Sequence, residues 1–314
     1  MIAYTLKRLL AGLFTVFFIA TATFAAMHAV PGDPLASGKA RSAEIRKNLQ
    51  VRYGLDKPVL VQYGVFLRNM ATGDFGISFT QPNRSVNDII RQHFPVSAVL
   101  GVFALFFATL GGILLGSITA RLRGQLADRT VLFLVVLGIS VPSFVFAALG
   151  QQAVLLLNQW AGAKVLPVAG WGSFRHILLP ALALGIGTLA FLTRLMRSSL
   201  LEIVHQDYVR TAKAKGLSPW RIFWFHQLRN GILPVITLLG PAFAAITTGG
   251  FVVESVFAIP GLGRYFVQAV QQLDYTVIMG LTVFYGAFLV LMVILVDILY
   301  GWVDPRIRVG KEAA

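Results

Sequence analysis

The chain has 314 residues, of which 56% are hydrophobic and only 13% are charged, and its formal net charge is +14. Soluble domains have about a quarter of their residues charged, so this composition excludes an ordinary soluble protein and indicates an integral membrane protein. The basic residues lie between apolar runs, so membrane topology and anionic lipid headgroups explain the charge better than nucleic acid does. The absence of cysteine excludes disulfides and thiolate metal sites.

Six apolar runs are long enough to cross a membrane, since a spanning helix needs about 20 residues. The first run follows Lys7 and Arg8. It is longer than the roughly 7–15 apolar residues of a signal peptide, so we expect it to stay in the protein as a span. The runs lie at residues 9–30, 96–120, 131–157, 176–198, 231–253 and 275–301. The sequence therefore predicts an all-α integral membrane protein with six transmembrane helices.

The basic residues also predict how the chain is divided and oriented. Among the short connections they concentrate on the side that holds the N-terminus, which is typical of the cytoplasmic side. We expect both termini to be cytoplasmic. Within the long external segment, residues 59–70 have helical spacing of apolar side chains. The expected parts are residues 1–30 with the first span, an external loop at 31–95, a five-helix core at 96–301 with a cytoplasmic loop at 199–230, and a cytoplasmic tail at 302–314.

Prolines and glycines interrupt several of the spans. Gly112 and Gly116 form a small-xxx-small pattern, which predicts close contact with another helix. Prolines allow kinks where neighbouring groups satisfy the freed carbonyls. The prolines within the runs are Pro142, Pro180, Pro234 and Pro241.

No motif for catalysis or nucleotide binding stands out. The triplet Asp74-Phe75-Gly76 spells a kinase metal-binding motif but has no companion motifs, and no GxxxxGK[ST] sequence occurs in the chain. The histidines have no metal-ligand spacing. Glu254 and Asp297 are acidic residues near the ends of spans, where water or a partner can stabilise them. We therefore expect no catalytic residue, no metal and no proton-coupled carrier.

The stretch from Asp207 to Asn230 is basic and has the sequence of a folded element. Asp207 is predicted to cap a short helix that ends at Gly216, and Ser218 is predicted to cap a second helix with Pro219 in its first turn. A solvated cytoplasmic loop is the simpler alternative. The basic residues of this stretch are Arg210, Lys213, Lys215, Arg221 and Arg229. Because the chain has no energy source of its own, a soluble partner could drive it through this element.

This stretch resembles the coupling loop of ABC importer permeases, whose pattern is Glu-Ala-Ala, three residues, Gly, nine residues and Ile-x-Leu-Pro. Only Ala212, Gly216 and Leu228 match the general form. The sequence YVRTAKAKGL at Tyr208–Leu217 is the version typical of the peptide/nickel importer permeases. Further motifs of that subfamily occur at Pro31–Pro34, Tyr53–Tyr63, Gly73–Phe79, Val141–Phe144, His176–Leu184, Glu254–Val270 and Asp304–Arg308. The segments Phe94–Gly101 and Leu238–Ser255 look most like the first permease subunit of oligopeptide importers.

The resemblance implies a type I ABC importer permease fold in the bacterial cytoplasmic membrane. A second homologous permease, two ATP-binding subunits that hold ATP and Mg, and an extracytoplasmic substrate-binding protein would be its partners. By their position in the motif, the residues expected to couple the chain to the ATPases are Arg210, Thr211, Ala212, Lys213, Ala214, Lys215, Gly216 and Leu217. The residues expected to line the pathway are Thr247, Thr248, Gly249, Gly250 and Glu254. The residues expected to meet the binding protein are Pro260, Gly261, Gly263 and Arg264.

Three hypotheses follow for the function. The first is import of short peptides. The second keeps the architecture but changes the cargo to nickel chelates, glutathione or another small solute. The third is a membrane anchor or sensor that transports nothing and needs no second permease, so co-purification of a paired homologue would count against it.

Overall fold

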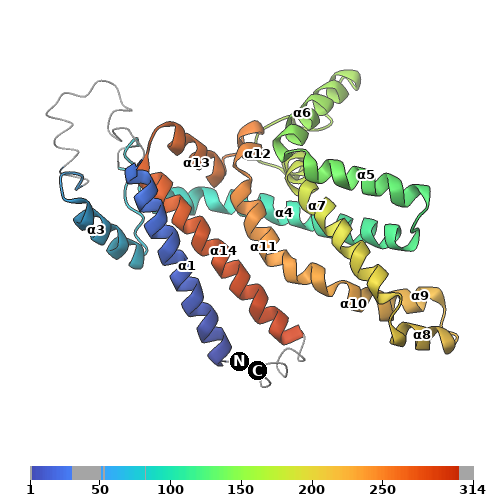
Figure 1. Cartoon of the computed structure of the whole chain (residues 1–314). Coiled ribbons are helices and arrows are strands. Elements are labelled where there is room, and N and C mark those ends of the chain that lie inside the picture. Colours follow the sequence, from blue (N-terminus) through green and yellow to red (C-terminus); the bar gives the residue numbers. More distant parts are fainter. Residues whose placement is uncertain (1, 30–50, 52–53, 82, 304–314) are drawn as a thin grey trace. The chain divides into compact units, whose positions relative to one another are not determined.

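The structure is a computed structural model that describes residues 2–29, 51, 54–81 and 83–303. Within these ranges every regular element is a helix, apart from an isolated pairing of Ile77 with Ser85 (Figure 1). The motifs at Pro31–Pro34 and Asp304–Arg308 lie outside the described residues. The described residues fall into two compact units, one drawn from residues 1–97 and 260–294 and the other from residues 98–259 and 295–314.

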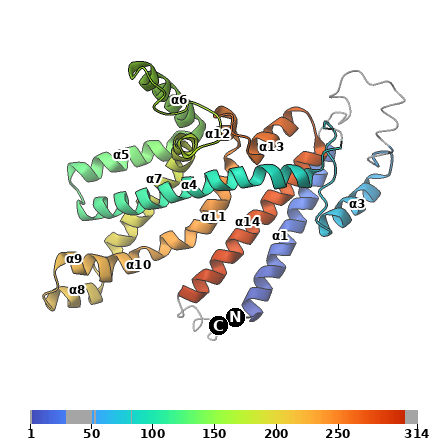
Figure 2. The ribbon, with the colours of Figure 1, turned by 180° about the vertical axis from the view of Figure 1, so that it is seen from behind.

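In the first unit, α1 and α14 lie side by side (Figures 1 and 2). Small residues allow this approach, since a Cβ atom on Gly12 would lie 2.8 Å from Cγ1 of Val290, and one on Gly286 would lie 2.7 Å from Cδ1 of Ile19. The helix predicted at residues 59–70 is confirmed as α3. The helices of this unit are α1 (Ile2–Ala29), α3 (Val59–Ala71), the start of α4 (Val86–Arg121), α13 (Leu262–Gln271) and most of α14 (Tyr275–Val303).

A buried carboxylate, Asp274, connects the segment after α3 to the start of α14. Its oxygens accept hydrogen bonds from the hydroxyls of Ser78 and Thr80 and from the backbone N–H groups of Phe79 and Thr80. They also accept one from the N–H of Val277 in the first turn of α14, as a helix-capping aspartate does. The carboxylate is only 1% exposed and well supplied with donors, so its burial is compensated.

The triplet Asp74-Phe75-Gly76 forms a turn beside this connection. Asp74 accepts a hydrogen bond from the N–H of Gly76, and Gly76 has a φ of +85°. Asn87, in the first turn of α4, accepts from the N–H of Phe75 and donates to the carbonyl of Gly73. The triplet therefore has a structural role in joining this turn to α4.

In the second unit, α7 packs against α5, α6 and α11. The predicted small-residue face of α4 is confirmed against α7, where a Cβ atom on Gly112 would lie 2.7 Å from Cβ of Leu192, and one on Gly116 would lie 2.7 Å from the carbonyl of Thr193. The long helices of this unit, besides the rest of α4, are α5 (Leu126–Ser140), α6 (Ser143–Trp160), α7 (Phe174–Ile203) and α11 (Leu233–Gly249), with the shorter α12 (Phe251–Val256) after them.

Four helices are long and apolar enough to cross a membrane, at Leu6–Ala29, Val86–Arg121, Phe174–Ile203 and Tyr275–Val296. Two bent pairs meet the same test together. They are Leu126–Ser140 with Ser143–Trp160, and Pro219–Gly231 with Leu233–Thr248. The predicted six spans are obtained when each bent pair counts as one.

The third predicted span, residues 131–157, is wrong as a single helix. The structure divides it into α5 and α6, which meet at an angle of 108°. Val141 has φ −90° and ψ 126°, and Pro142 has φ −59° and ψ 143°, so both leave the helical region. A residue before proline is displaced from the α region by the proline ring, which ends α5 at this point.

Helix α4 begins at Val86, ahead of the predicted boundary at residue 96. Ser85 and Asp88 start the helix, since the Ser85 hydroxyl accepts from the N–H of Asp88 and donates to its carboxylate. This arrangement satisfies one of the free N–H groups of the first turn. Pro95 lies inside the helix. The last part of the segment expected as an external loop is therefore helical.

We expect Gly116→Ala to destabilise the protein, because the added methyl group would meet a backbone carbonyl that cannot rotate away. Overpacking of this kind costs about 1–3 kcal/mol. Gly64→Ala is the matched control, since Gly64 lies in α3 with no atom within 4 Å of an added Cβ. Thermal unfolding in detergent should show a lower midpoint only for Gly116→Ala. Equal midpoints would contradict the close α4–α7 contact.

Candidate functional site

The candidate site is the basic element that follows α7, beginning with α8 (Asp207–Ala214). Gln206 is the residue before its first turn, with φ −70° and ψ 147° and no side-chain capping bond. The prediction that Asp207 caps this helix is therefore wrong. Asp207 lies one position later, in the first turn, where its negative charge still favours the positive end of the helix dipole.

The end of α8 has the geometry predicted from Gly216. Its φ is +72°, its N–H donates to the carbonyl of Lys213 at 2.9 Å, and the N–H of Leu217 donates to the carbonyl of Ala212 at 3.3 Å. These two bonds together form a Schellman motif, which stops the helix and reverses the chain. Glycine is favoured here because a side chain would strain the left-handed backbone.

The predicted cap of the second helix is confirmed. The Ser218 hydroxyl accepts a hydrogen bond from the N–H of Arg221 at 3.4 Å, and Pro219 lies in the first turn of α9 (Pro219–Ile222). The helix does not stop there. It continues as a π-helix, η1 (Phe223–Leu228), then as α10 (Arg229–Gly231), and reaches α11.

Helices α8 and α9 are held together by a small apolar cluster. Val209, Ala212 and Ile222 are buried, and Ile203 and Leu217 pack against them. Complete burial of a side chain such as Val209 is worth about 1.5–3 kcal/mol. The element is therefore a packed helical hairpin attached to the end of α7, and the solvated-loop alternative does not describe it.

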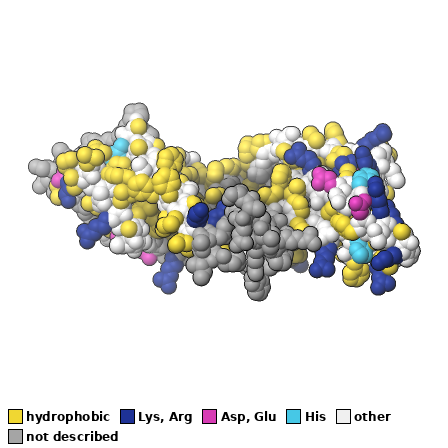
Figure 3. Space-filling view, turned by 60° about the horizontal axis from the view of Figure 1, so that its bottom comes forward, with side chains coloured by type: hydrophobic (Ala, Val, Ile, Leu, Met, Phe, Trp, Pro, Cys, Tyr) yellow, Lys and Arg dark blue, Asp and Glu magenta, His cyan; other side chains and the backbone are white. Residues whose placement is uncertain are grey.

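Most of the residues predicted to contact the ATPases form the outer face of this hairpin. Ala212 is buried and Leu217 is half-buried in the apolar cluster, so both have a packing role. Figure 3 shows Lys and Arg side chains gathered at the end of the molecule formed by α8 and α9. The exposed predicted residues are Arg210, Thr211, Lys213, Ala214, Lys215 and Gly216.

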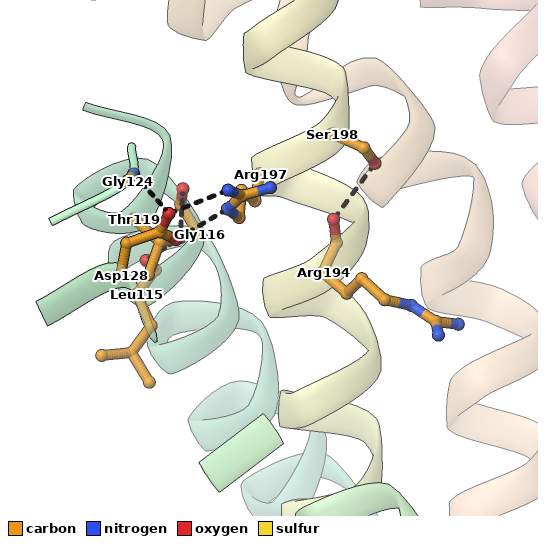
Figure 4. Close-up of polar contacts among 8 residues, drawn as sticks. All are labelled: Leu115, Gly116, Thr119, Gly124, Asp128, Arg194, Arg197 and Ser198. Carbon is orange, nitrogen blue, oxygen red and sulfur yellow. Dashed lines mark hydrogen bonds and ion pairs between the residues drawn. The ribbon is translucent and has the colours of Figure 1, made fainter. Parts of the chain in front are cut away.

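A buried ion pair holds the last turns of α7, close in sequence to the hairpin (Figure 4). Arg197 donates from Nε to Oδ1 of Asp128 at 2.8 Å and from Nη2 to Oδ2 at 2.9 Å. The N–H of Gly124, in the turn between α4 and α5, donates to the same carboxylate. The Asp128 side chain is 4% exposed. The pair therefore joins α7 to the start of α5 by two parallel charge-assisted hydrogen bonds.

Sequence reasoning missed this pair. A signal existed, because Asp128 is the only acidic residue between residues 96 and 201 and lies beside an apolar run. The neighbouring Arg194 is exposed, with its guanidinium 6.0 Å from the ring centroid of Phe191. The sequence positions of Arg194 and Arg197 alone do not show which of the two forms the ion pair with Asp128.

The predicted pathway residues lie in and after α11. Thr247 is buried and lies against α4, since its Oγ1 would be 2.7 Å from a Cβ atom on Gly101. Thr248 is half-buried, and its hydroxyl donates to the carbonyl of Ala244. Gly250 and Glu254 are buried, and the burial of Gly249 lies outside what the structure describes. A pathway role for these residues stays a prediction.

The predicted contacts with a binding protein are only partly accessible. Pro260 is exposed and Arg264 is half-buried, whereas Gly261 and Gly263 are buried at the start of α13. The N–H of Leu262 donates to the buried hydroxyl of Ser97, which fixes this start. No group of three or more His, Cys, Asp or Glu side chains that could hold a metal ion occurs in the described part of the chain.

Comparison with known proteins identifies the family. Residues 112–309 match the family described as binding-protein-dependent transport system inner membrane component, and residues 1–101 match the N-terminal part of such membrane components. The chain belongs to this family. Its membership agrees with the apolar helices, so the protein is a multi-pass membrane permease component.

Individual relatives in the family match over their full length. The dipeptide transport system permease protein DppB of Bacillus subtilis is 46% identical over 99% of this chain and 100% of its own. The oligopeptide transport system permease protein OppB of Haemophilus influenzae is 41% identical over 98% of this chain and 100% of its own length. The structure of the MetNI methionine ABC transporter matches with a TM-score of 0.52 and 18% identity, covering 68% of this chain and 94% of that one. This likeness confirms the type I importer permease fold.

We expect Asp128→Asn to destabilise this permease by about 3 kcal/mol, because Arg197 would keep its charge in a largely buried place without a counter-charge. Adding Arg197→Gln to Asp128→Asn should recover part of the loss, so that the two effects are not additive. Arg194→Gln is the matched control and should change little. Unfolding in detergent by denaturant is measured for the parent, the two single variants Asp128→Asn and Arg197→Gln, the double variant and the control. Additive losses would show that the two side chains do not stabilise each other.

Proposed function

We propose that this chain is the permease subunit of an ATP-binding cassette importer and forms, with a second homologous permease, the translocation pathway for short peptides. The relatives named as dipeptide and oligopeptide permeases support the peptide cargo, because the match covers their whole length. One structural observation supports the coupling role above all. It is the packed hairpin of α8 and α9, which has an exposed basic face in a chain without a nucleotide-binding motif.

The outer face of α8 would dock into a groove on the surface of one ATPase partner and move with it. Such a contact transmits motion only if the helix is rigid in its own subunit. Val209 and Ala212 provide that rigidity by burial, and the Schellman motif at Gly216 fixes the end of the helix. The exposed Arg210, Lys213 and Lys215 would supply charge complementarity to the partner.

The partners would provide the energy and the cargo. Two ATP-binding subunits would hold ATP and Mg, since the chain has no phosphate-binding loop of its own. We assign no catalytic step to this subunit. A substrate-binding protein would deliver the cargo at the external side, where Pro260 and Arg264 are accessible while the buried Gly261 and Gly263 shape the turn.

The orientation proposed here places both termini and the hairpin in the cytoplasm of a bacterial cell, with the chain in its cytoplasmic membrane. The short connections support it, because their Lys and Arg residues gather on the side of the N-terminus and the hairpin. Residues 31–95 would be external, together with the connection between α6 and α7.

We expect the double substitution Arg210→Glu with Lys213→Glu to lower substrate-stimulated ATP hydrolysis of the assembled importer by about tenfold, because the reversed charges would repel the partner surface. Both side chains are exposed, so insertion of the subunit should be normal. Lys164→Glu, at an exposed lysine before α7, is the control and should hydrolyse ATP as the parent does. An unchanged rate in the double variant would overturn the coupling role of α8.

The absence of cysteine permits a direct test of orientation by single-cysteine labelling. In intact spheroplasts, a membrane-impermeant maleimide should label Lys164→Cys and leave Lys215→Cys unlabelled until the membrane is permeabilised. Both positions are exposed, so burial cannot account for a difference. The opposite pattern would reverse the proposed orientation.

A further inference from the structure

The second half of the hairpin has two different faces. Ile222 is buried against α8, and Phe223 and Leu228 pack on the cluster formed by α7 and α11. Trp220, Trp224 and Phe225 point away from this packing and are 60%, 47% and 68% exposed. Large aromatic side chains are costly to expose in water, so this face requires an explanation.

The outward aromatic residues form an ordered surface. The rings of Trp220 and Trp224 meet edge to face with centroids 5.7 Å apart, and Phe223 stacks beneath Trp220 at 6.2 Å. A shallow depression on this surface is lined by Ser218, Trp220, Arg221, Trp224 and Phe225. We name these five residues the aromatic–basic face. It combines apolar rings, a hydroxyl and a guanidinium within one depression.

The segment of chain that carries the aromatic–basic face has charge of one sign. Arg221 and Arg229 are exposed, and no Asp or Glu occurs between Tyr208 and Val253. An anionic ligand is therefore the complementary one. A guanidinium suits a phosphate group well, because its planar N–H groups bind two oxygens at once.

The position of the face along the chain indicates where it lies. The helical path continues from Phe225 through α10 to Leu233, where the apolar α11 begins. Eight residues of helix at 1.5 Å each place the rings about 12 Å before the start of α11, in the first half of the bent pair Pro219–Gly231 with Leu233–Thr248. Tryptophan is enriched at the boundary between hydrocarbon and water, where its ring is partly apolar and its N–H can meet polar groups.

The π-helix provides the geometry for this arrangement. Trp224 and Val235 are eleven residues apart, which in an unbroken α-helix would place them within about 20° of the same face. Val235 is fully buried, whereas Trp224 is exposed. The wider turn of η1 and the 45° bend before α11 rotate the two faces apart. The π-helix therefore turns the tryptophan side chains away from the core.

We propose that the aromatic–basic face binds the headgroups of anionic phospholipids and anchors the hairpin at the membrane surface. The rings insert at the level of the headgroups, and Arg221 binds the phosphate. Helix α8, with no exposed Trp or Phe, remains available to a soluble partner. This inference requires only that α11 lies in the membrane, and so it does not rest on the proposed cargo or on ATP-driven transport.

The test uses the full chain in vesicles with Trp224 as the only tryptophan. Trp160, Trp171, Trp220 and Trp302 are replaced by phenylalanine, and emission is measured with lipids brominated near the headgroup. We expect brominated phosphatidylglycerol to quench Trp224 more strongly than brominated phosphatidylcholine. Arg221→Gln should lower this preference about fivefold, the effect of one basic side chain at a membrane surface. Arg210→Gln, on α8, is the control and should leave it unchanged.

Other results would overturn the proposal. Water-like emission from Trp224 without quenching by either lipid would show that the face does not meet the membrane. Equal quenching by both lipids, in the parent and in Arg221→Gln, would refute recognition of the anionic headgroup. Loss of quenching on assembly with the ATP-binding subunits would assign the face to a protein partner. Retained quenching in the assembled importer would support the anchor.

Discussion

The close approach of α4 and α7 is the contact on which the larger unit depends. Gly112 and Gly116 allow α7 to touch α4 without a side chain between them, so the two helices cannot slide freely. In a membrane such packing replaces the hydrophobic force that water provides to soluble proteins. The ion pair of Asp128 with Arg197 then fixes the last turns of α7. The hairpin is attached directly to this fixed end, and its position follows from the packing above it.

Local chemistry made much of this architecture predictable from the sequence. Gly216 and Ser218 determine a turn through backbone conformation and capping, which depend on neighbouring residues alone. The apolar runs predicted the spans because the bilayer requires length and hydrophobicity. The Gly112 and Gly116 pattern predicted a close contact, although the sequence could not name α7 as the partner. Helix α3 was predicted from periodicity for the same local reason.

The features that were not predicted depend on residues distant in the chain or on small free-energy differences between alternative local conformations. Asp207 and Gln206 compete for the same cap position, and the structure places the helix start one residue away from the expected site. The π-helix cannot be read from a 3.6-residue period, because its signature is a break in that period. Asp128 and Arg197 are 69 positions apart in the chain. Gly261 and Gly263 were expected to be accessible, but Ser97 and the start of α13 enclose that turn.

The hydrogen bonds that Asp274 accepts from the segment after α3 depend on the order in which the chain is synthesised. Ser78 and Thr80 leave the ribosome long before the carboxylate that binds them, and residues 98–259 are synthesised in between. At about 5–20 residues per second, this interval lasts roughly 10–40 seconds. The first two candidate spans, Leu6–Ala29 and Val86–Arg121, are therefore made while the segment between them still lacks this contact. That contact forms only when Asp274 has been synthesised, so a truncated chain that ends before Asp274 cannot make it.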